Sequence, residues 1–110
     1  MKLPDLENAI LDSGKLRDYL LSSEHPIGRF KATFFAALGY SREGSFRLEG
    51  DFRTLIASES AILGGASAFG QKYEVRGTLT GPAGRSARVV TVWIVLVGET
   101  SPRFVTAYPG

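Results

Sequence analysis

Three runs of β-forming residues, separated by two short turns, fill the last third of the chain and constrain its fold more than any other feature. Apolar and polar side chains alternate along the first run, Lys72–Thr80, as expected for a strand with one buried face. The second run, Ser86–Val97, is the most continuously apolar, which predicts a central strand covered at least partly on both faces. The third is Arg103–Ala107. Because turns this short join antiparallel strands, the pattern predicts an antiparallel meander.

Three segments with helical spacing of apolar residues precede the meander. In the second, Phe30, Phe34 and Leu38 recur every four residues, so we expect Phe34 to lie in the core. Asp12 and Ser13 supply capping oxygens before the first segment. The predicted helices are Ser13–Leu21, Gly28–Leu38 and Phe46–Ala57.

Residues Ala61–Gly70 are small and glycine-rich, which predicts a mobile loop between the helices and the sheet. Helices followed by a meander are typical of an α+β fold, with the helices packed on one sheet face. At 110 residues the chain is expected to be a single domain, 1–110.

The composition narrows the classes of function. The chain has no cysteine and one histidine, which argues against disulfides and zinc sites, and we expect no metal and no cofactor. It shows neither a signal peptide nor a membrane-length apolar run, so we expect a cytoplasmic protein with no membrane partner. A net charge of +2 permits an anionic partner such as RNA.

Candidate functional residues surround the start of the second helix. His25 precedes a proline, and an imidazole suits proton transfer near neutral pH; the alternative is a surface or helix-capping residue. Arg29 and Lys31 begin the helix, where an anion would offset their unfavourable position relative to the helix dipole. The alternative for both is a solvated charge.

The predicted sheet offers a second basic set. Lys72, Arg76 and Arg88 share one face if the turn between their strands is tight, and such a face can hold phosphates. The alternative is an ordinary solvated sheet face.

The C-terminal strand carries a third set, Arg103, Thr106 and Tyr108. Alternation places Arg103 and Thr106 on opposite faces unless a bulge intervenes. Tyr108, like Tyr73 and Trp93, is either a core aromatic or a platform on which a base stacks.

Four stretches in combination resemble a bacterial family of small proteins catalogued as domain of unknown function 6883, over nearly the whole chain. They read KLRDYLLSSEHPIGRFKATFFAALGY, QKYEVRGTLTGPAGR, VTVWIV and PRFVTAYP. More remotely, helices before an antiparallel sheet resemble the barnase, EndoU, colicin and RelE-like toxins, many of which cut RNA without a metal. This resemblance implies a site formed by His25, Lys31, Arg103, Thr106 and Tyr108.

The resemblance leads to two hypotheses. In the first, the protein is a metal-independent ribonuclease of the toxin type, paired with a small β-rich antitoxin-like protein. His25 would be its general acid or base, and Lys31 and Arg103 would stabilise the transition state. Thr106 and Tyr108 would orient the phosphate or serve as proton donors. The nucleic-acid-binding residues would be Arg29, Lys72, Arg76 and Arg88. In the second hypothesis, the chain is a non-catalytic protein-binding module with a basic sheet face.

Overall fold

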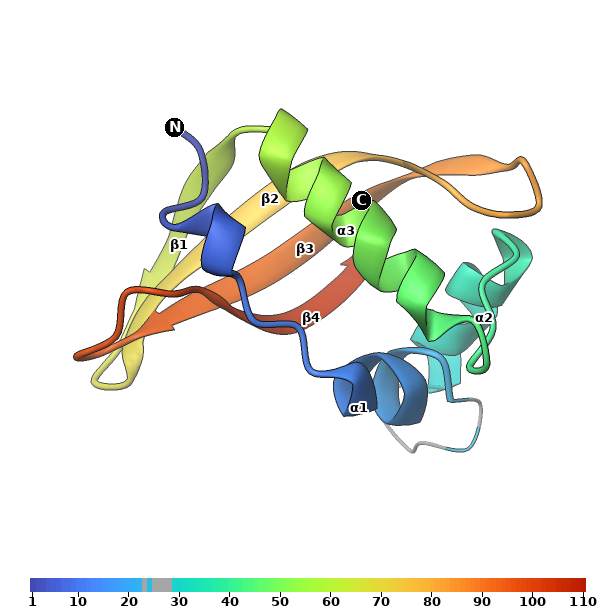
Figure 1. Ribbon diagram of the computed structural model, residues 1–110, viewed down its shortest axis with the longest axis horizontal. Coiled ribbons are helices and arrows are strands. Elements are labelled where there is room, and N and C mark those ends of the chain that lie inside the picture. Colours follow the sequence, from blue (N-terminus) through green and yellow to red (C-terminus); the bar gives the residue numbers. More distant parts are fainter. Residues whose placement is uncertain (23, 25–28) are drawn as a thin grey trace.

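The computed structural model describes residues 1–22, 24 and 29–110, and it consists of helical segments followed by one sheet (Figure 1). The helical segments are η1 (Leu6–Asn8), α1 (Ser13–Lys15), the π-helical η2 (Leu16–Leu20), α2 (Arg29–Ala37) and α3 (Ser45–Ser58). The strands are β1 (Ala61–Ala66), β2 (Gly70–Thr80), β3 (Ser86–Leu96) and β4 (Arg103–Pro109).

The sheet is an antiparallel meander in the order β1-β2-β3-β4, which confirms the predicted α+β architecture. The β2–β3 pair is regular over its whole length, from Gly70 opposite Leu96 to Thr80 opposite Ser86. In Figure 1, α3 crosses one face of the sheet, while α1 and α2 lie beyond β4. No helix in the described part of the chain is long and apolar enough to cross a membrane.

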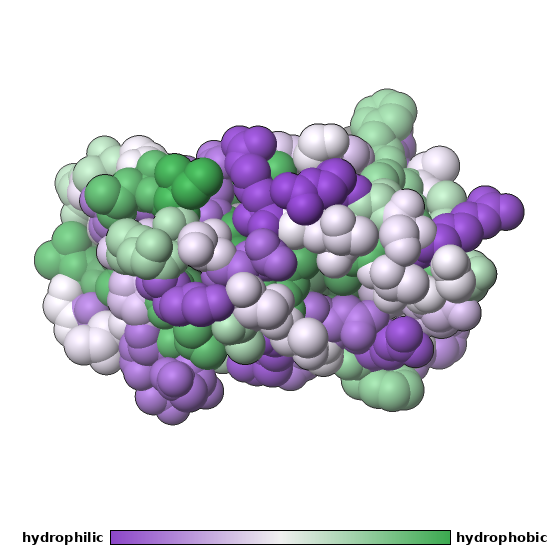
Figure 2. All heavy atoms as spheres, turned by 90° about the horizontal axis from the view of Figure 1, so that it is seen from above, coloured by the Kyte–Doolittle hydropathy of each residue, from purple (hydrophilic) through white to green (hydrophobic). Residues whose placement is uncertain are grey.

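The predicted loop at Ala61–Gly70 is wrong, because β1 occupies most of it. Ile62 lies opposite Glu74 and Leu63 opposite Tyr73, so pairing with β2 supplies the backbone hydrogen bonds that the local sequence does not indicate. Ala61 is the only fully buried residue of this strand. The sequence therefore lacks the apolar–polar alternation that marks a half-buried strand. Seen from above in Figure 2, hydrophobic residues gather toward the end of the molecule where β1 lies.

The first predicted helix is present as the continuous α1–η2 segment. Asp12 caps it, with Oδ1 accepting a hydrogen bond from the Gly14 amide at 2.8 Å. Leu16 and Leu20 are buried as their spacing indicates. The final turn widens, since the Leu21 amide donates to the Leu16 carbonyl five residues earlier.

The second predicted helix is present as α2, but the expected core position of Phe34 is wrong. Phe35 is fully buried, whereas Phe34 is only partly buried and Phe30 is 72% exposed. The four-residue spacing of Phe30, Phe34 and Leu38 predicts a buried face of α2. The face that contacts the core is rotated from it by about one residue. That face instead carries Ala32, Phe35 and Leu38 at spacings of three.

The far end of α2 is fixed to the β2–β3 turn. The Ala83 amide donates to the Leu38 carbonyl at 3.1 Å, and Gly39 follows with a φ of 99°. A side chain at Gly39 would meet Ala83 and would also strain this left-handed backbone. The glycine thus ends the helix where the turn must approach.

The third predicted helix is present as α3, and the apolar residues on one of its sides, Leu48, Phe52, Leu55 and Ile56, are all buried. Phe52 stacks on Phe104 with ring centroids 5.5 Å apart, and Trp93 meets Phe104 edge-on at 5.4 Å. The Trp93 indole donates to Thr91, so its polar atom is satisfied inside the core. Trp93 is therefore a core aromatic rather than an exposed stacking platform.

Candidate functional site

Three polar side chains from distant parts of the chain converge beside β4. Lys31 Nζ lies 2.8 Å from Tyr19 Oη and 3.0 Å from Thr106 Oγ1, and donates to both. The two hydroxyl oxygens are 3.3 Å apart. We call Tyr19, Lys31 and Thr106 the β4-edge cluster. It joins an ammonium to two groups that can each donate or accept a proton.

Helix packing positions two members of the cluster. Tyr19 lies in η2 between the buried anchors Leu16 and Leu20. Lys31 is four residues before Phe35 and so lies on the same side of α2, at the margin of the core. Burial of Phe35 therefore sets where the Lys31 ammonium can reach.

A β-bulge positions the third member. Val92 pairs with Thr106 and the next residue, Trp93, pairs with Phe104, which leaves Val105 as the extra residue of β4. This register places Arg103, Thr106 and Tyr108 opposite β3 residues of one face. The sequence had made a shared face conditional on such a bulge.

The shared face does not bring Arg103 into the β4-edge cluster. Its Nε and Nη2 bond the two carboxylate oxygens of Glu99 at 3.0 and 3.2 Å. The hydrogen bonds and charge of Arg103 hold the pKa of Glu99 below its usual range, and Glu99 raises the pKa of Arg103 in turn. The guanidinium is thus already paired at the turn end of β4. In the described residues, no contact links Arg103 to Lys31, Thr106 or Tyr108.

The surroundings of Tyr19 make its phenol more acidic than usual. Burial raises the pKa of Tyr19, but hydrogen bonds from Lys31 and Thr106 and the charges of Lys31 and Lys15 together lower it below the usual value. The Lys31 ammonium also lies 5.2 Å from the centre of the Tyr19 ring. A phenol with a lowered pKa gives up its proton more readily at the pH of a cell.

An open cleft of about 690 Å³ adjoins the cluster, between the α1–η2 segment and β4. Tyr19 and Thr106 form part of its wall, and Lys15 crosses it to donate to the Val105 carbonyl at 3.1 Å. The cleft is also lined by Asp12, Gly14, Asp18 and Val105. Its volume falls within the range of ligand-binding pockets.

The basic sheet residues occupy one face, as predicted. Arg88 lies opposite Thr78 and donates to it at 3.4 Å, while Arg76 pairs with Glu74 at 2.9 Å. Lys72 follows the same alternation, and all three basic side chains are exposed. Arg76 and Tyr108 are both opposite Val90, so the face continues from these residues to β4.

The remaining residues predicted from the sequence are Arg29, Tyr108 and His25. Arg29 is exposed at the start of α2, with its guanidinium 4.9 Å from the centre of the Phe30 ring. Tyr108 is partly buried, and His25 lies outside the described residues. The described residues contain no cluster of three or more histidine, cysteine, aspartate or glutamate side chains able to hold a metal ion.

Sequence reasoning missed Tyr19 as a functional candidate. Helical spacing places Tyr19 near Leu16 and Leu20, on the side of the segment that packs on the core, and it lies there partly buried. The available signal was the hydroxyl, because a tyrosine at the margin of a core needs a polar partner for that group. Spacing alone could not identify that partner as Lys31, which is 12 residues away.

Comparison with known proteins finds a family model and similar solved structures. The family model described as "Domain of unknown function (DUF6883)" matches residues 2–110. A search of curated proteins finds no match. The chain superimposes with a TM-score of 0.71 on a chain of the "Contact-dependent growth inhibition toxin - immunity protein complex from Klebsiella pneumoniae 342". The two share 21% identity over 94% of this chain and 95% of that one, a level that supports likeness of fold.

Proposed function

The chain belongs to the DUF6883 family, and we propose that it is a metal-independent ribonuclease of the toxin type. The observation that carries the proposal is the convergence of Lys31 with the Tyr19 and Thr106 hydroxyls beside an open cleft. Cleavage of RNA needs a base, an acid and a cation near one phosphate. The β4-edge cluster offers groups for at least two of these roles.

In the proposed reaction the ribose 2′-oxygen attacks the neighbouring phosphorus and the 5′-oxygen leaves. The 2′-hydroxyl loses its proton to a general base, and a general acid protonates the departing oxygen. The products are a 2′,3′-cyclic phosphate and a 5′-hydroxyl, so atoms and charge balance without water or a metal. Lys31 has a third N–H to offer a phosphate oxygen, since two are used by its neighbours.

We assign the proton-donor role to Tyr19 because the pKa of its phenol is lowered and because it lies within hydrogen-bond distance of Lys31. Thr106 Oγ1 helps to fix the positions of Lys31 Nζ and Tyr19 Oη through contacts of 3.0 and 3.3 Å, respectively. The second proton-transfer role is assigned to His25 on the sequence argument alone, since an imidazole is half-protonated near neutral pH.

The RNA strand is proposed to continue from the β4-edge cluster onto the sheet face that carries Arg76 and Arg88. Thr106, Arg76 and Arg88 share that face by register, so phosphates flanking the scissile one would meet arginine side chains. Arginine binds phosphate through two parallel hydrogen bonds, which fixes the strand without reading its sequence. Lys72 and Arg29 would add charge at either side.

A protein partner forms part of the proposal. The similar chain comes from a complex described as toxin with immunity protein, and we propose a small β-rich antitoxin-like partner for this chain. Expression of this protein alone is then expected to arrest bacterial growth. Normal growth in cells that accumulate the folded protein would contradict the toxin proposal.

The direct test is cleavage of a labelled RNA by the purified protein, by Lys31→Met and by the matched control Lys2→Met. Lys31→Met is expected to lower the rate about 10²–10³-fold, the scale for loss of one transition-state donor. Lys2 is exposed and has no role in the proposed site, so its variant should remain within a few-fold of the parent. A chelator is expected to leave the rate unchanged. If the parent cleaves no RNA and is harmless in cells, the protein-binding module takes precedence.

A further inference from the structure

The free edge of β4 is held by a different partner at each of three successive residues. β4 is the last strand of the sheet, and one of its edges faces the helical segments instead of another strand (Figure 1). Near the start of β4, the Phe104 amide donates to the Ile10 carbonyl at 2.9 Å. The next residue, Val105, accepts from Lys15 Nζ at 3.1 Å through its carbonyl, and Thr106 belongs to the β4-edge cluster. Lys15 therefore contacts β4 between its backbone-paired start and the cluster.

The residue that Lys15 contacts is the one that forms the bulge. In the register of β3 and β4, both described throughout, Val105 is an extra residue between Phe104 and Thr106. An extra residue leaves the regular ladder of backbone hydrogen bonds, so its carbonyl needs a donor from elsewhere. The Lys15 ammonium is such a donor. Because the bulge sets the side of the strand on which Thr106 emerges, a contact that fixes Val105 also fixes Thr106.

Lys15 and Tyr19 contact β4 as a pair. They are four residues apart in the continuous α1–η2 segment, so their side chains lie on the same side of it. Lys15 contacts Val105 at 3.1 Å, and Tyr19 Oη lies 3.3 Å from Thr106 Oγ1. All four residues line the open cleft. One helical segment thus holds two consecutive residues of β4.

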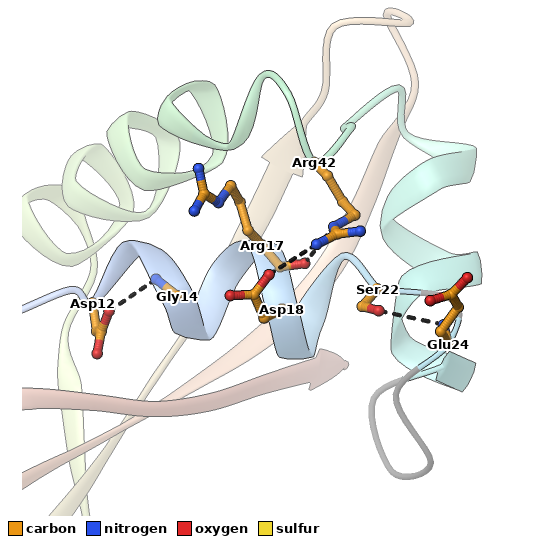
Figure 3. A network of polar contacts seen from close by, with 7 residues as sticks. All are labelled: Asp12, Gly14, Arg17, Asp18, Ser22, Glu24 and Arg42. Carbon is orange, nitrogen blue, oxygen red and sulfur yellow. Dashed lines mark hydrogen bonds and ion pairs between the residues drawn. The ribbon is translucent and has the colours of Figure 1, made fainter.

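The α1–η2 segment has attachments of its own. Asp12 caps its start, with Oδ1 accepting from the Gly14 amide at 2.8 Å. On the opposite side of the molecule from β4's ladder, Arg42 donates to the Arg17 carbonyl at 3.0 Å and to Asp18 Oδ1 at 2.8 Å (Figure 3). These contacts do not involve Lys15, so replacement of Lys15 should leave the segment in place.

We propose that Lys15 is a positioning residue of the site: by holding the Val105 carbonyl it fixes the β4 bulge and thereby keeps Thr106 within reach of Lys31 and Tyr19. As a statement about catalysis, this role rests on the proposed ribonuclease function. The Lys15 ammonium contacts a main-chain oxygen of the protein, so it acts through the placement of Thr106 rather than on the phosphate.

The charge of Lys15 supports the same role. Burial raises the pKa of Tyr19, whereas the hydrogen bonds and charge within the β4-edge cluster and the charge of Lys15 lower it below the usual value. Asp12 and Asp18, the latter paired with Arg42, line the same cleft and carry the opposite charge. Loss of the Lys15 ammonium should therefore raise the pKa of Tyr19.

The first test is cleavage of a labelled RNA by Lys15→Met, which keeps the aliphatic stem, and by Lys15→Arg, which keeps the charge and N–H donors. Lys15→Met is expected to lower kcat about 3- to 10-fold, the scale for one hydrogen bond, with KM unchanged. Lys15→Arg should recover most of that loss. Lys2→Met replaces another exposed lysine and should match the parent. A rise in KM with kcat unchanged would make Lys15 a phosphate-binding residue and overturn the positioning role.

A double-mutant cycle tests whether Lys15 acts through Thr106. If it does, Lys15→Met should change cleavage little further in a Thr106→Val background, because the contact that it fixes is already lost. A loss that adds in full to that of Thr106→Val would overturn the proposal.

Measurements without RNA separate this role from the cleavage reaction. In Lys15→Met the backbone amide resonance of Thr106 should shift and the phenolate midpoint of Tyr19 should rise, while Lys15→Arg and Lys2→Met should resemble the parent. If both changes occur in a protein that cleaves no RNA, the placement of Thr106 by Lys15 stands and the ribonuclease proposal falls. If neither changes while the parent cleaves RNA, the ribonuclease proposal stands and the role of Lys15 falls.

Discussion

Basic residues with opposite surroundings lie toward the two ends of β4. Lys31 of α2 contacts Thr106 toward one end, and Arg103 begins the strand at the other. At the helix-covered end, Lys31 donates to two hydroxyl oxygens at 2.8 and 3.0 Å, and no carboxylate of the described residues pairs with it. At the turn end, Arg103 meets the Glu99 carboxylate through two hydrogen bonds, so its charge is locally cancelled. Both residues were candidates for the same role from sequence. The partner, rather than the residue type, separates them.

The difference indicates where an anion would bind first. A phosphate approaching Lys31 gains a cation with an N–H to spare, whereas one approaching Arg103 must first displace Glu99. The Arg103–Glu99 pair is exposed, so the exchange costs little, but it gives no net attraction in the resting protein. The helix-covered end is therefore the stronger candidate for the reacting phosphate.

Replacement of Tyr19 should have the largest effect. Tyr19→Phe removes the proposed proton donor while keeping the ring, and we expect RNA cleavage to fall about 10²–10⁴-fold, or about 2.7–5.4 kcal/mol. Tyr73→Phe, which changes a partly buried tyrosine in β2, is the matched control. Equal rates for the two variants would remove Tyr19 from the mechanism and with it the distinction between the ends of β4.

The second-largest effect is expected from replacing Phe35, the fully buried residue that holds α2 on the core. Phe35→Ala empties a fully buried site and should lower the free energy of unfolding by about 3–5 kcal/mol in denaturant melts. Phe34→Ala, at the margin of the core, should cost about 1 kcal/mol. The reverse order would mean that α2 is rotated from the position that brings Lys31 to Thr106.

Substitutions at the turn end of β4 should change RNA cleavage only slightly. Arg103→Gln is expected to lower cleavage about fivefold or less, since interactions between exposed charges are weak. Glu99→Gln releases the guanidinium and should raise cleavage slightly. A loss with Arg103→Gln as large as with Lys31→Met would place both ends of β4 at the reacting phosphate and erase the comparison.

The smallest effect concerns titration of Tyr19. Its pKa is lowered, so phenolate absorbance, taken as the difference between the parent and Tyr19→Phe, should appear below the ordinary value of about 10. Thr106→Val removes one lowering hydrogen bond and should move the midpoint upward. Tyr40 provides the internal control, because burial and its hydrogen bond to Asp51 raise the pKa of its phenol.

The lowered pKa of Tyr19 also predicts how the free energy of unfolding changes with pH. Because the folded pKa of Tyr19 is below the unfolded one, the unfolded chain holds more protons between the two values. The free energy of unfolding should therefore gain a contribution as the pH rises through that interval, and lose it as the pH falls through the folded pKa. A parent and a Tyr19→Phe variant with identical alkaline stability profiles would contradict the lowered pKa.

Much of the architecture follows from local sequence. The apolar run of β3, the turns on either side of it and the buried side of α3 were all predictable, because period-two and helical patterns report which face is buried. The pattern failed to predict β1, because Ile62 and Leu63 are both exposed and their order does not show which face of the strand is buried. It also failed by one residue at α2, because spacings of three and four select neighbouring faces.

By itself, the sequence determined the α+β order, the antiparallel meander and the set of charged residues available for a site. Tertiary structure decided which of them meet. The β4 bulge turned Thr106 and Tyr108 to the face of Arg103, and the packing of Phe35 brought Lys31 to that strand across 75 residues of chain. Local patterns record burial within one element. Contacts between elements depend on register and packing angle, which no short stretch of sequence encodes.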